Sequence, residues 1–197
     1  DQKPGDARVH NFLATFYRAI GAGEQSREHA AIATTLSPEK PSLLIEQAVV
    51  ELQGNELEAG LAFLKTAFYL EERNTQARVL YAAVLIQTGA LEEAKALIEA
   101  DEKYVKQFAL NDYALSATQA AGDFEFLAEL FKARVANQPT NAQHRASLAF
   151  VYYQLGDIEK SIETLTQAGE EIQTFAPTAT CYVANLQAGN APDQGCN

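Results

Sequence analysis

Apolar residues recur along the chain at the spacing of amphipathic helices. Between positions 158 and 168 the apolar residues are three or four positions apart: Ile158, Ile162, Leu165 and Ala168. The same spacing returns in segments 91–98 and 124–131. Steps of three and four place side chains on one face of a helix, whereas a half-buried strand alternates every second residue. The pattern therefore predicts an all-α fold.

Six of the eleven glycines punctuate these helical segments at a nearly constant interval. They lie at steps of 33, 35, 33, 34 and 33 residues: Gly21, Gly54, Gly89, Gly122, Gly156 and Gly189. Glycine ends a helix in the left-handed conformation without a Cβ penalty, and an Asp or Asn after it caps the next helix. Pro38 and Pro139 each follow a ladder glycine by 17 residues, where the second helix of a pair should stop. We predict positive φ at Gly122 and Gly156.

The period and its residue types resemble the tetratricopeptide repeat family, whose pattern is W-x-x-L-G-x-x-Y, then A-x-x-x-F, then P. The clearest match is the fifth repeat, with Leu148-Ala149-x-x-Tyr152, Gly156-Asp157 and Ser161-x-x-x-Leu165. The Trp position never holds Trp, and the second repeat carries one extra residue. The resemblance implies a right-handed superhelix of about five helix-turn-helix pairs with a final capping helix.

The repeats also give the expected domain boundaries. Residues 1–6 are a linker stub, residues 7–190 the repeat domain and residues 191–197 a flexible tail. Within the domain the repeats are expected at about 7–40, 41–74, 75–107, 108–141 and 142–174, with the capping helix at 178–188.

Composition narrows the classes of partner. Asp and Glu outnumber Lys and Arg by 26 to 15, for a net charge of −11, which argues against nucleic acid and anionic membranes. The longest apolar run, residues 79–86, is far below the ~20 residues of a transmembrane helix. Because the sequence contains no Met, we expect a processed product or a segment of a longer protein.

The two cysteines, Cys181 and Cys196, could form a disulfide in an oxidising compartment or remain thiols. Thiols are favoured because Cys196 lies in the tail that is expected to be mobile.

No catalytic constellation is evident. His10, His29 and His144 fall in three different predicted helices, and none stands at ligand spacing from another histidine or a cysteine, so a zinc site is not expected. The glycines are too far apart for a phosphate loop, and no G-x-S-x-G elbow is present. We therefore expect no enzyme activity, no cofactor and no metal.

The resemblance implies instead a peptide-binding groove, lined by the first helix of each pair. Carried over by register, the groove residues are Asn11, Thr15, Arg18, Val79, Ala83, Ile86, Gln87, Asp112, Ser116, Gln119, Ala146, Phe150, Tyr153 and Gln154. Lys and Arg do not converge on this face, which argues against recognition of an acidic peptide terminus. Val79, Ile86 and Phe150 could equally pack between helices.

The expected function is thus a non-catalytic scaffold that binds a protein or peptide. An alternative comes from four phrases that resemble the repeat tail of bacterial O-antigen ligase/polymerase membrane proteins: Leu36-Ser37-Pro38, Ala77-Arg78-Val79-Leu80-Tyr81-Ala82-Ala83, Phe131-Lys132-Ala133-Arg134-Val135 and Asn141-Ala142-Gln143. This resemblance implies a soluble module of an envelope glycosyltransferase, and it favours the bacterial cell envelope over the cytoplasm. A free chaperone or secretion adaptor would show the same helical pattern.

Overall fold

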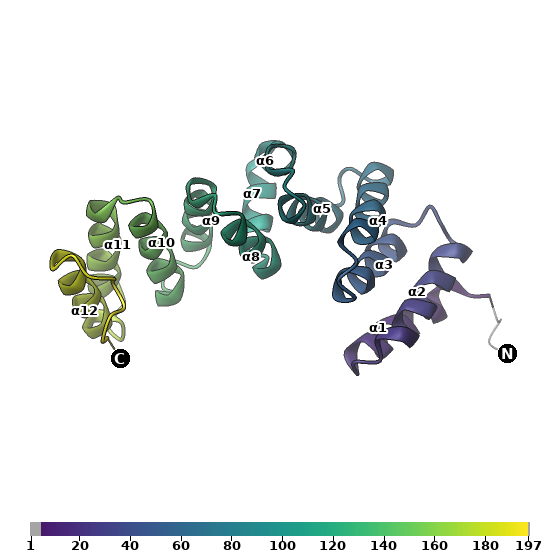
Figure 1. Cartoon of the computed structure of the whole chain (residues 1–197), viewed down its shortest axis with the longest axis horizontal. Coiled ribbons are helices and arrows are strands. Elements are labelled where there is room, and N and C mark those ends of the chain that lie inside the picture. The colour runs from purple at the N-terminus through teal and green to yellow at the C-terminus, as the bar shows by residue number, and fades with distance from the viewer. Residues whose placement is uncertain (1–4, 197) are drawn as a thin grey trace. The chain divides into compact units, whose positions relative to one another are not determined.

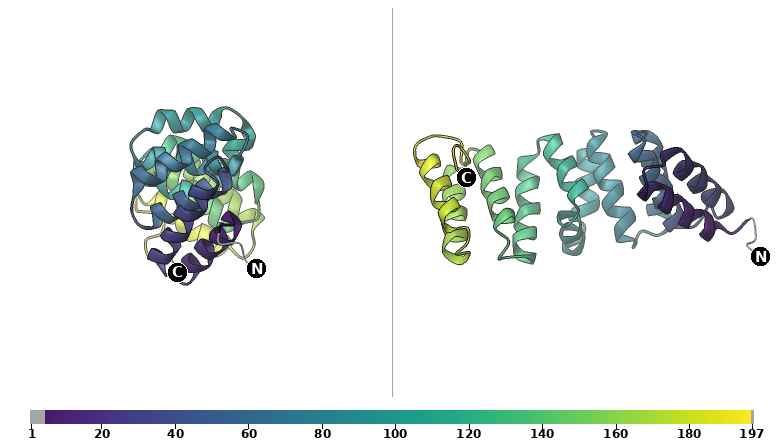
Figure 2. Two further views of the ribbon diagram at one scale, coloured as in Figure 1. Left: turned by 90° about the vertical axis from the view of Figure 1, so that its right-hand side faces the viewer. Right: turned by 90° about the horizontal axis from the view of Figure 1, so that it is seen from below.

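The computed structural model describes residues 5–196, and every regular element between them is a helix (Figures 1 and 2). The chain divides into two compact units, Asp1–Ala100 and Asp101–Asn197. The expected linker stub falls mostly on residues 1–4, outside the described part. Of the rest of that stub, Asp6 caps the first helix by accepting a hydrogen bond from the Arg8 amide at 2.9 Å.

The first unit consists of three helix pairs. Its helices are α1 (Ala7–Ala19), α2 (Gly23–Leu36), α3 (Pro41–Gln53), α4 (Leu57–Leu70), α5 (Thr75–Gln87) and α6 (Leu91–Glu99). Each helix packs against the next one in the chain. Ala14, Ala30 and Val50 form a buried cluster that joins α1, α2 and α3, so the first pair shares its core with the second.

The second unit also consists of helices that pack against their neighbours in the chain, and the helices differ in length. They are α7 (Glu102–Ala109), α8 (Asp112–Ala121), α9 (Phe124–Asn137), α10 (Ala142–Gln154), α11 (Ile158–Glu171) and α12 (Ala176–Gln187). Helix α9 contacts α7, α8 and α10, while α11 packs between α10 and α12. Ala149, Leu165 and Leu186 form the buried cluster that holds these last three helices together.

A hydrogen bond that occurs at the same position in both units shows that their helix pairs share a geometry. The buried Ser26 hydroxyl donates to the Ala14 carbonyl at 2.9 Å, and the buried Ser161 hydroxyl donates to the Ala149 carbonyl at 2.8 Å. Each bond joins the second helix of a pair to the first, across the same sequence separation of 12 residues. A small polar residue at this position allows the two helices to approach closely.

The expected boundary between the third and fourth repeats, at 107/108, is wrong because it falls inside α7. Residues 91–109 form two short helices in place of one long second helix. Asp101 starts α7 by accepting from the Lys103 amide at 2.9 Å, and Asn111 starts α8 by accepting from the Ala114 amide at 3.0 Å. These two caps offer the backbone an alternative to a continuous helix.

The left-handed turns fall at five of the six predicted glycines. Gly122 and Gly156 have φ of 74° and 75°, which confirms the prediction made for them. At the second repeat the expectation fails: Gly54 has φ −77°, and Asn55 takes the left-handed conformation at φ 64°. The steps from 21 to 55 and from 55 to 89 are then 34 residues each, so the extra residue of the second repeat disappears.

The caps predicted after the glycines form in the second unit. Asp123 accepts from the Phe126 amide at 2.9 Å and Asp157 from the Lys160 amide at 3.1 Å. Asn55 is not a cap, because it occupies the turn position itself. Helices α2 and α9 end before Pro38 and Pro139, as predicted. Among the described residues, none of the helices is both long and apolar enough to cross a bilayer.

Candidate functional site

A cavity of about 250 Å³ opens in the second unit beside α10. Its apolar lining comes mainly from α9 and α10, and amide and hydroxyl groups lie around it. Its lining includes Gln119, Phe131, Gln143, Ser147, Phe150 and Tyr182. The arrangement joins a hydrophobic surface to side chains that can both donate and accept hydrogen bonds.

Three of the predicted groove residues meet at this cavity. Gln119 lies at the end of α8, and Ala146 and Phe150 lie one turn apart on α10. Phe150 is 39% exposed. Phe12, Phe16 and Tyr69 of the first unit are more exposed, but Phe150 also lines this cavity. These three predicted residues therefore share one cavity, and their role in binding stays a prediction.

Tyr153 and Gln154 differ from this group. The Tyr153 ring lies 6.2 Å from the Phe150 ring centroid, but it also packs against the buried Ala149–Leu165–Leu186 cluster. Tyr153 is therefore half in the core, while Gln154 is exposed at the end of α10. Removing Tyr153 would disturb packing as well as any ligand contact.

On α8 the predicted residues Asp112 and Ser116 are exposed. Asp112 is already engaged, since its carboxylate accepts a hydrogen bond from the Arg134 guanidinium of α9 at 2.6 Å. This ion pair links the start of α8 to the last turn of α9.

The three predicted residues of α1 lie in the first unit. Thr15 donates to Glu46 Oε1 at 3.2 Å, and Arg18 Nε donates to the same oxygen at 3.0 Å. Asn11 is half-buried and its Oδ1 atom accepts no hydrogen bond. Thr15 and Arg18 hold α1 to α3 through Glu46, and Arg18 also borders a separate hollow of about 380 Å³ with Glu24 and Arg27.

The expectation that Val79, Ala83 and Ile86 line a groove is corrected by their burial. They are 4%, 0% and 3% exposed, so they are core residues, and packing between helices is the interpretation that holds for Val79 and Ile86. Gln87, at the end of α5, is exposed. The uninterrupted apolar run 79–86 was the available signal, because a helix that is apolar on every side is buried.

The fold also brings together two histidines that the sequence placed in separate helices. His10 Nδ1 and His29 Nδ1 are 2.9 Å apart, and the His29 ring stacks on Tyr17 with centroids 5.4 Å apart. One nitrogen must donate and the other accept, so this bond requires at least one neutral ring. No group of three or more metal-ligand side chains gathers within residues 5–196.

His144, at the start of α10, is the one histidine of the second unit. It is 9% exposed, and its Nδ1 atom has no hydrogen-bond partner. Burial lowers the pKa of His144 below its ordinary value of 6.5, and the positive charge of Arg134 acts in the same direction, while Asp112 opposes both.

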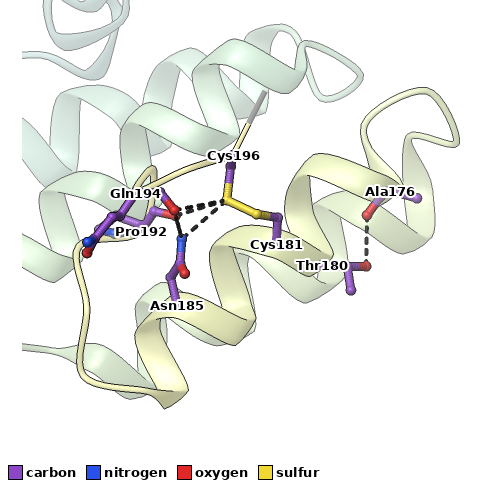
Figure 3. Close-up of a disulfide and its surroundings, with 7 residues drawn as sticks. All are labelled: Ala176, Thr180, Cys181, Asn185, Pro192, Gln194 and Cys196. Carbon is purple, nitrogen blue, oxygen red and sulfur yellow. Dashed lines mark hydrogen bonds between the residues drawn. A yellow bond between two sulfur atoms is a disulfide. The ribbon is translucent and has the colours of Figure 1, made fainter.

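Cys181 and Cys196 form a disulfide, with Cα atoms 6.0 Å apart, so the expectation of free thiols is wrong. The expected flexible tail is also wrong for residues 191–196, because this segment is tied to α12 (Figure 3). The Asn185 amide donates to the Pro192 carbonyl at 2.9 Å and to the Gln194 carbonyl at 2.8 Å. The sequence of the polar tail does not reveal that the Asn185 side chain of α12 binds two of its carbonyls.

No protein-family model matches the sequence, and no curated protein matches it. Solved structures do resemble the fold. MamA 41-end from Desulfovibrio magneticus RS-1 has a TM-score of 0.62 at 15% identity, covering 83% of this chain and 93% of that one. A tetratricopeptide repeat protein from Parabacteroides merdae ATCC 43184 has a TM-score of 0.63 at 13% identity, with coverages of 95% and 73%.

A third similar structure is YrrB, described as a TPR protein with an unusual peptide-binding site. It has a TM-score of 0.56 at 16% identity, covering 85% of this chain and 87% of that one. At these identities the likeness concerns the fold alone. The chain has an all-α fold of the tetratricopeptide repeat type, and its resemblance to O-antigen ligase/polymerase tails stays a prediction.

Proposed function

We propose that this chain is a non-catalytic scaffold that binds a peptide or protein segment at the cavity beside α10. The observation that carries the proposal is Phe150, a large aromatic side chain held 39% exposed beside a cavity on a first helix. Aromatic anchors at a concave surface are typical of protein recognition sites. The fold, shared with repeat proteins that include one described by its peptide-binding site, is compatible with this function.

The size and chemistry of the cavity indicate the kind of ligand. Its volume of about 250 Å³ is smaller than the ~300–1,000 Å³ of small-molecule pockets, and it suits one large apolar side chain of a peptide. Gln119, Gln143 and Ser147 can hydrogen-bond the peptide backbone on either side of that anchor. A net charge of −11 disfavours acidic ligands, so we propose a neutral or basic segment with one apolar anchor.

Selection of peptides from a random phage-displayed library against the full chain tests this function. Fluorescence anisotropy would then measure the affinity of a selected synthetic peptide for the wild type and for three variants. We expect Phe150→Ala and Gln119→Ala to weaken binding at least tenfold. Thr15→Ala is the matched control, because Thr15 holds the register position of Phe150 on α1 and is exposed. Equal losses in all three variants, or no selected peptide, would reject the proposal.

We further propose that the chain works in an oxidising compartment, as a module of a bacterial envelope protein of the O-antigen ligase/polymerase type. The disulfide supports this proposal, because such bonds persist outside the reducing cytosol. Cell fractionation and blotting with an antibody against the chain test it. A membrane-bound band much larger than 21.4 kDa, with blocked cysteines, is the expected result. A free band of about that mass in the cytoplasm, with reactive thiols, would contradict it.

A further inference from the structure

Within residues 5–196, helix α12 differs from the other first helices in what packs against it. In the described residues α1, α3, α5, α8 and α10 each pack against the helix that follows them. No helix follows α12 between residues 188 and 196. One face of α12 would therefore be open to solvent if nothing else covered it.

Register identifies that face. Asn185 lies four residues before the left-handed Gly189, as Tyr152 lies four residues before Gly156. The Tyr152 ring faces α11, with Lys160 Nζ 5.7 Å from its centroid. Asn185 therefore occupies the position that in α10 turns toward the second helix of the pair. Cys181 lies one helical turn earlier on the same face.

The segment 190–196 covers this face and reaches the candidate cavity. Asn185 binds the carbonyls of Pro192 and Gln194, and the Cys181–Cys196 bond fixes the segment one turn away (Figure 3). Pro192 is buried, and Pro192 and Asp193 line the cavity together with Phe150 and Tyr182. The segment is thus both the cover of α12 and one wall of the proposed binding site.

We propose that segment 190–196 is a redox-controlled strap that narrows the cavity while the Cys181–Cys196 disulfide is intact and opens it after reduction. The reductant is a dithiol: its two thiols supply two electrons and two protons, the S–S bond breaks into two Cys thiols, and the dithiol becomes a disulfide. The ligand whose access the strap controls is the peptide of the proposed function. This inference therefore rests on that proposed function.

The disulfide is a covalent link between the strap and α12, and the other contacts are hydrogen bonds and packing. Without the bond, the hydrogen bonds from Asn185, the turns within the strap and the buried Pro192 must offset the conformational entropy of ordering the whole segment. The cross-link spans 15 residues and limits the segment to conformations close to α12. Its reduction therefore shifts the segment toward open conformations and removes Pro192 and Asp193 from the cavity wall.

Hydrogen–deuterium exchange of the full chain tests the strap without any ligand. In the oxidised protein the Gln194 and Cys196 amides donate to the Ala191 and Asp193 carbonyls, so they are expected to exchange slowly. After reduction with dithiothreitol, and in a Cys181→Ser/Cys196→Ser variant without reductant, both should exchange at least tenfold faster. The amides of α12 should change by less than twofold, and reductant should have no further effect on the variant.

A reporter at the cavity provides the second measurement. The chain has no Trp, so Tyr182→Trp introduces a single tryptophan beside the strap, whose fluorescence can be excited selectively. We expect its acrylamide quenching constant to rise about twofold on reduction, and to be already high when the two serine substitutions are added. A selected peptide should bind the reduced wild type at least fivefold more tightly than the oxidised form.

Any one of three outcomes would overturn the strap proposal. They are unchanged exchange at residues 190–196 after reduction, loss of protection throughout α12, or two alkylated cysteines in the protein purified without reductant. If exchange and quenching respond as expected but no peptide binds in either redox state, the strap stands and the proposed function fails.

Discussion

Helices α5 and α10 occupy the same register in their repeats, but the corresponding residues are buried in α5 and partly exposed in α10. Val79, Ala83 and Ile86 of α5 correspond to Ala146, Phe150 and Tyr153 of α10, counted back from Gly89 and Gly156. The α5 residues are buried, whereas Phe150 is exposed and Ala146 lines a cavity. The repeat pattern specifies which face of a helix is presented. Whether that face is exposed to solvent depends on which neighbouring residues pack against it.

The largest loss of stability should come from truncating Ile86, a buried residue of α5. Ile86→Ala removes three carbons from a side chain that is 3% exposed, and we expect a loss of about 2–5 kcal/mol in the free energy of unfolding. Phe150→Ala, on the exposed surface of α10, should cost about 1 kcal/mol or less. Urea unfolding followed by circular dichroism measures both. Similar losses would mean that Phe150 is a core residue and would remove the basis of the candidate site.

A turn substitution gives the next effect. Gly156 has φ 75°, and no atom beyond its chain neighbours lies within 4 Å of the position a Cβ would take, so Gly156→Val tests backbone strain. We expect it to destabilise the chain by about 1–2 kcal/mol. Gly5→Val, at a position of ordinary φ before α1, is the control and should leave the unfolding midpoint unchanged. Equal midpoints for the two variants would contradict the assignment of Gly156 as a left-handed turn.

The smallest effect is a pH dependence confined to the second unit. The folded-state pKa of His144 is lowered, so below pH 6.5 the unfolded chain binds more protons at this imidazole than the folded chain does. Its contribution to stability is therefore complete above pH 6.5 and decreases as the pH falls toward the folded-state pKa. Unfolding midpoints at pH 7.5 and 5.5 should differ less in His144→Gln than in the wild type. The same difference in both proteins would show that His144 does not titrate on unfolding.

Much of the fold could be predicted from local signals. Glycine spacing, Asp caps and prolines act within a few residues of the turns that they form, and they located most helix ends correctly. The turn at Asn55 could not be predicted so easily, because Gly54 lies against Arg27, where an added Cβ would collide with the Nη2 atom. That contact arises only when α2 and α3 have packed.

The site was less predictable, because its properties depend on contacts between helices. Phe150 and Gln119 were identified by register, but the burial of Ala83 and the His10–His29 pair depend on packing that periodicity does not describe. The strap depends on Asn185, one amide whose role is set by the carbonyls it meets. The residues that determine access to the cavity are therefore those that the repeat pattern leaves out.

Photo-crosslinking tests the central claim most directly, that ligand binds at the α10 position and not at its register equivalent in the first unit. p-Benzoylphenylalanine would be placed at position 150 in one protein and at position 15 in another, and each would be irradiated with a selected peptide. The account predicts a crosslinked product from the position 150 protein and none above background from the other. Crosslinking at position 15 that equals or exceeds that at position 150 would contradict it.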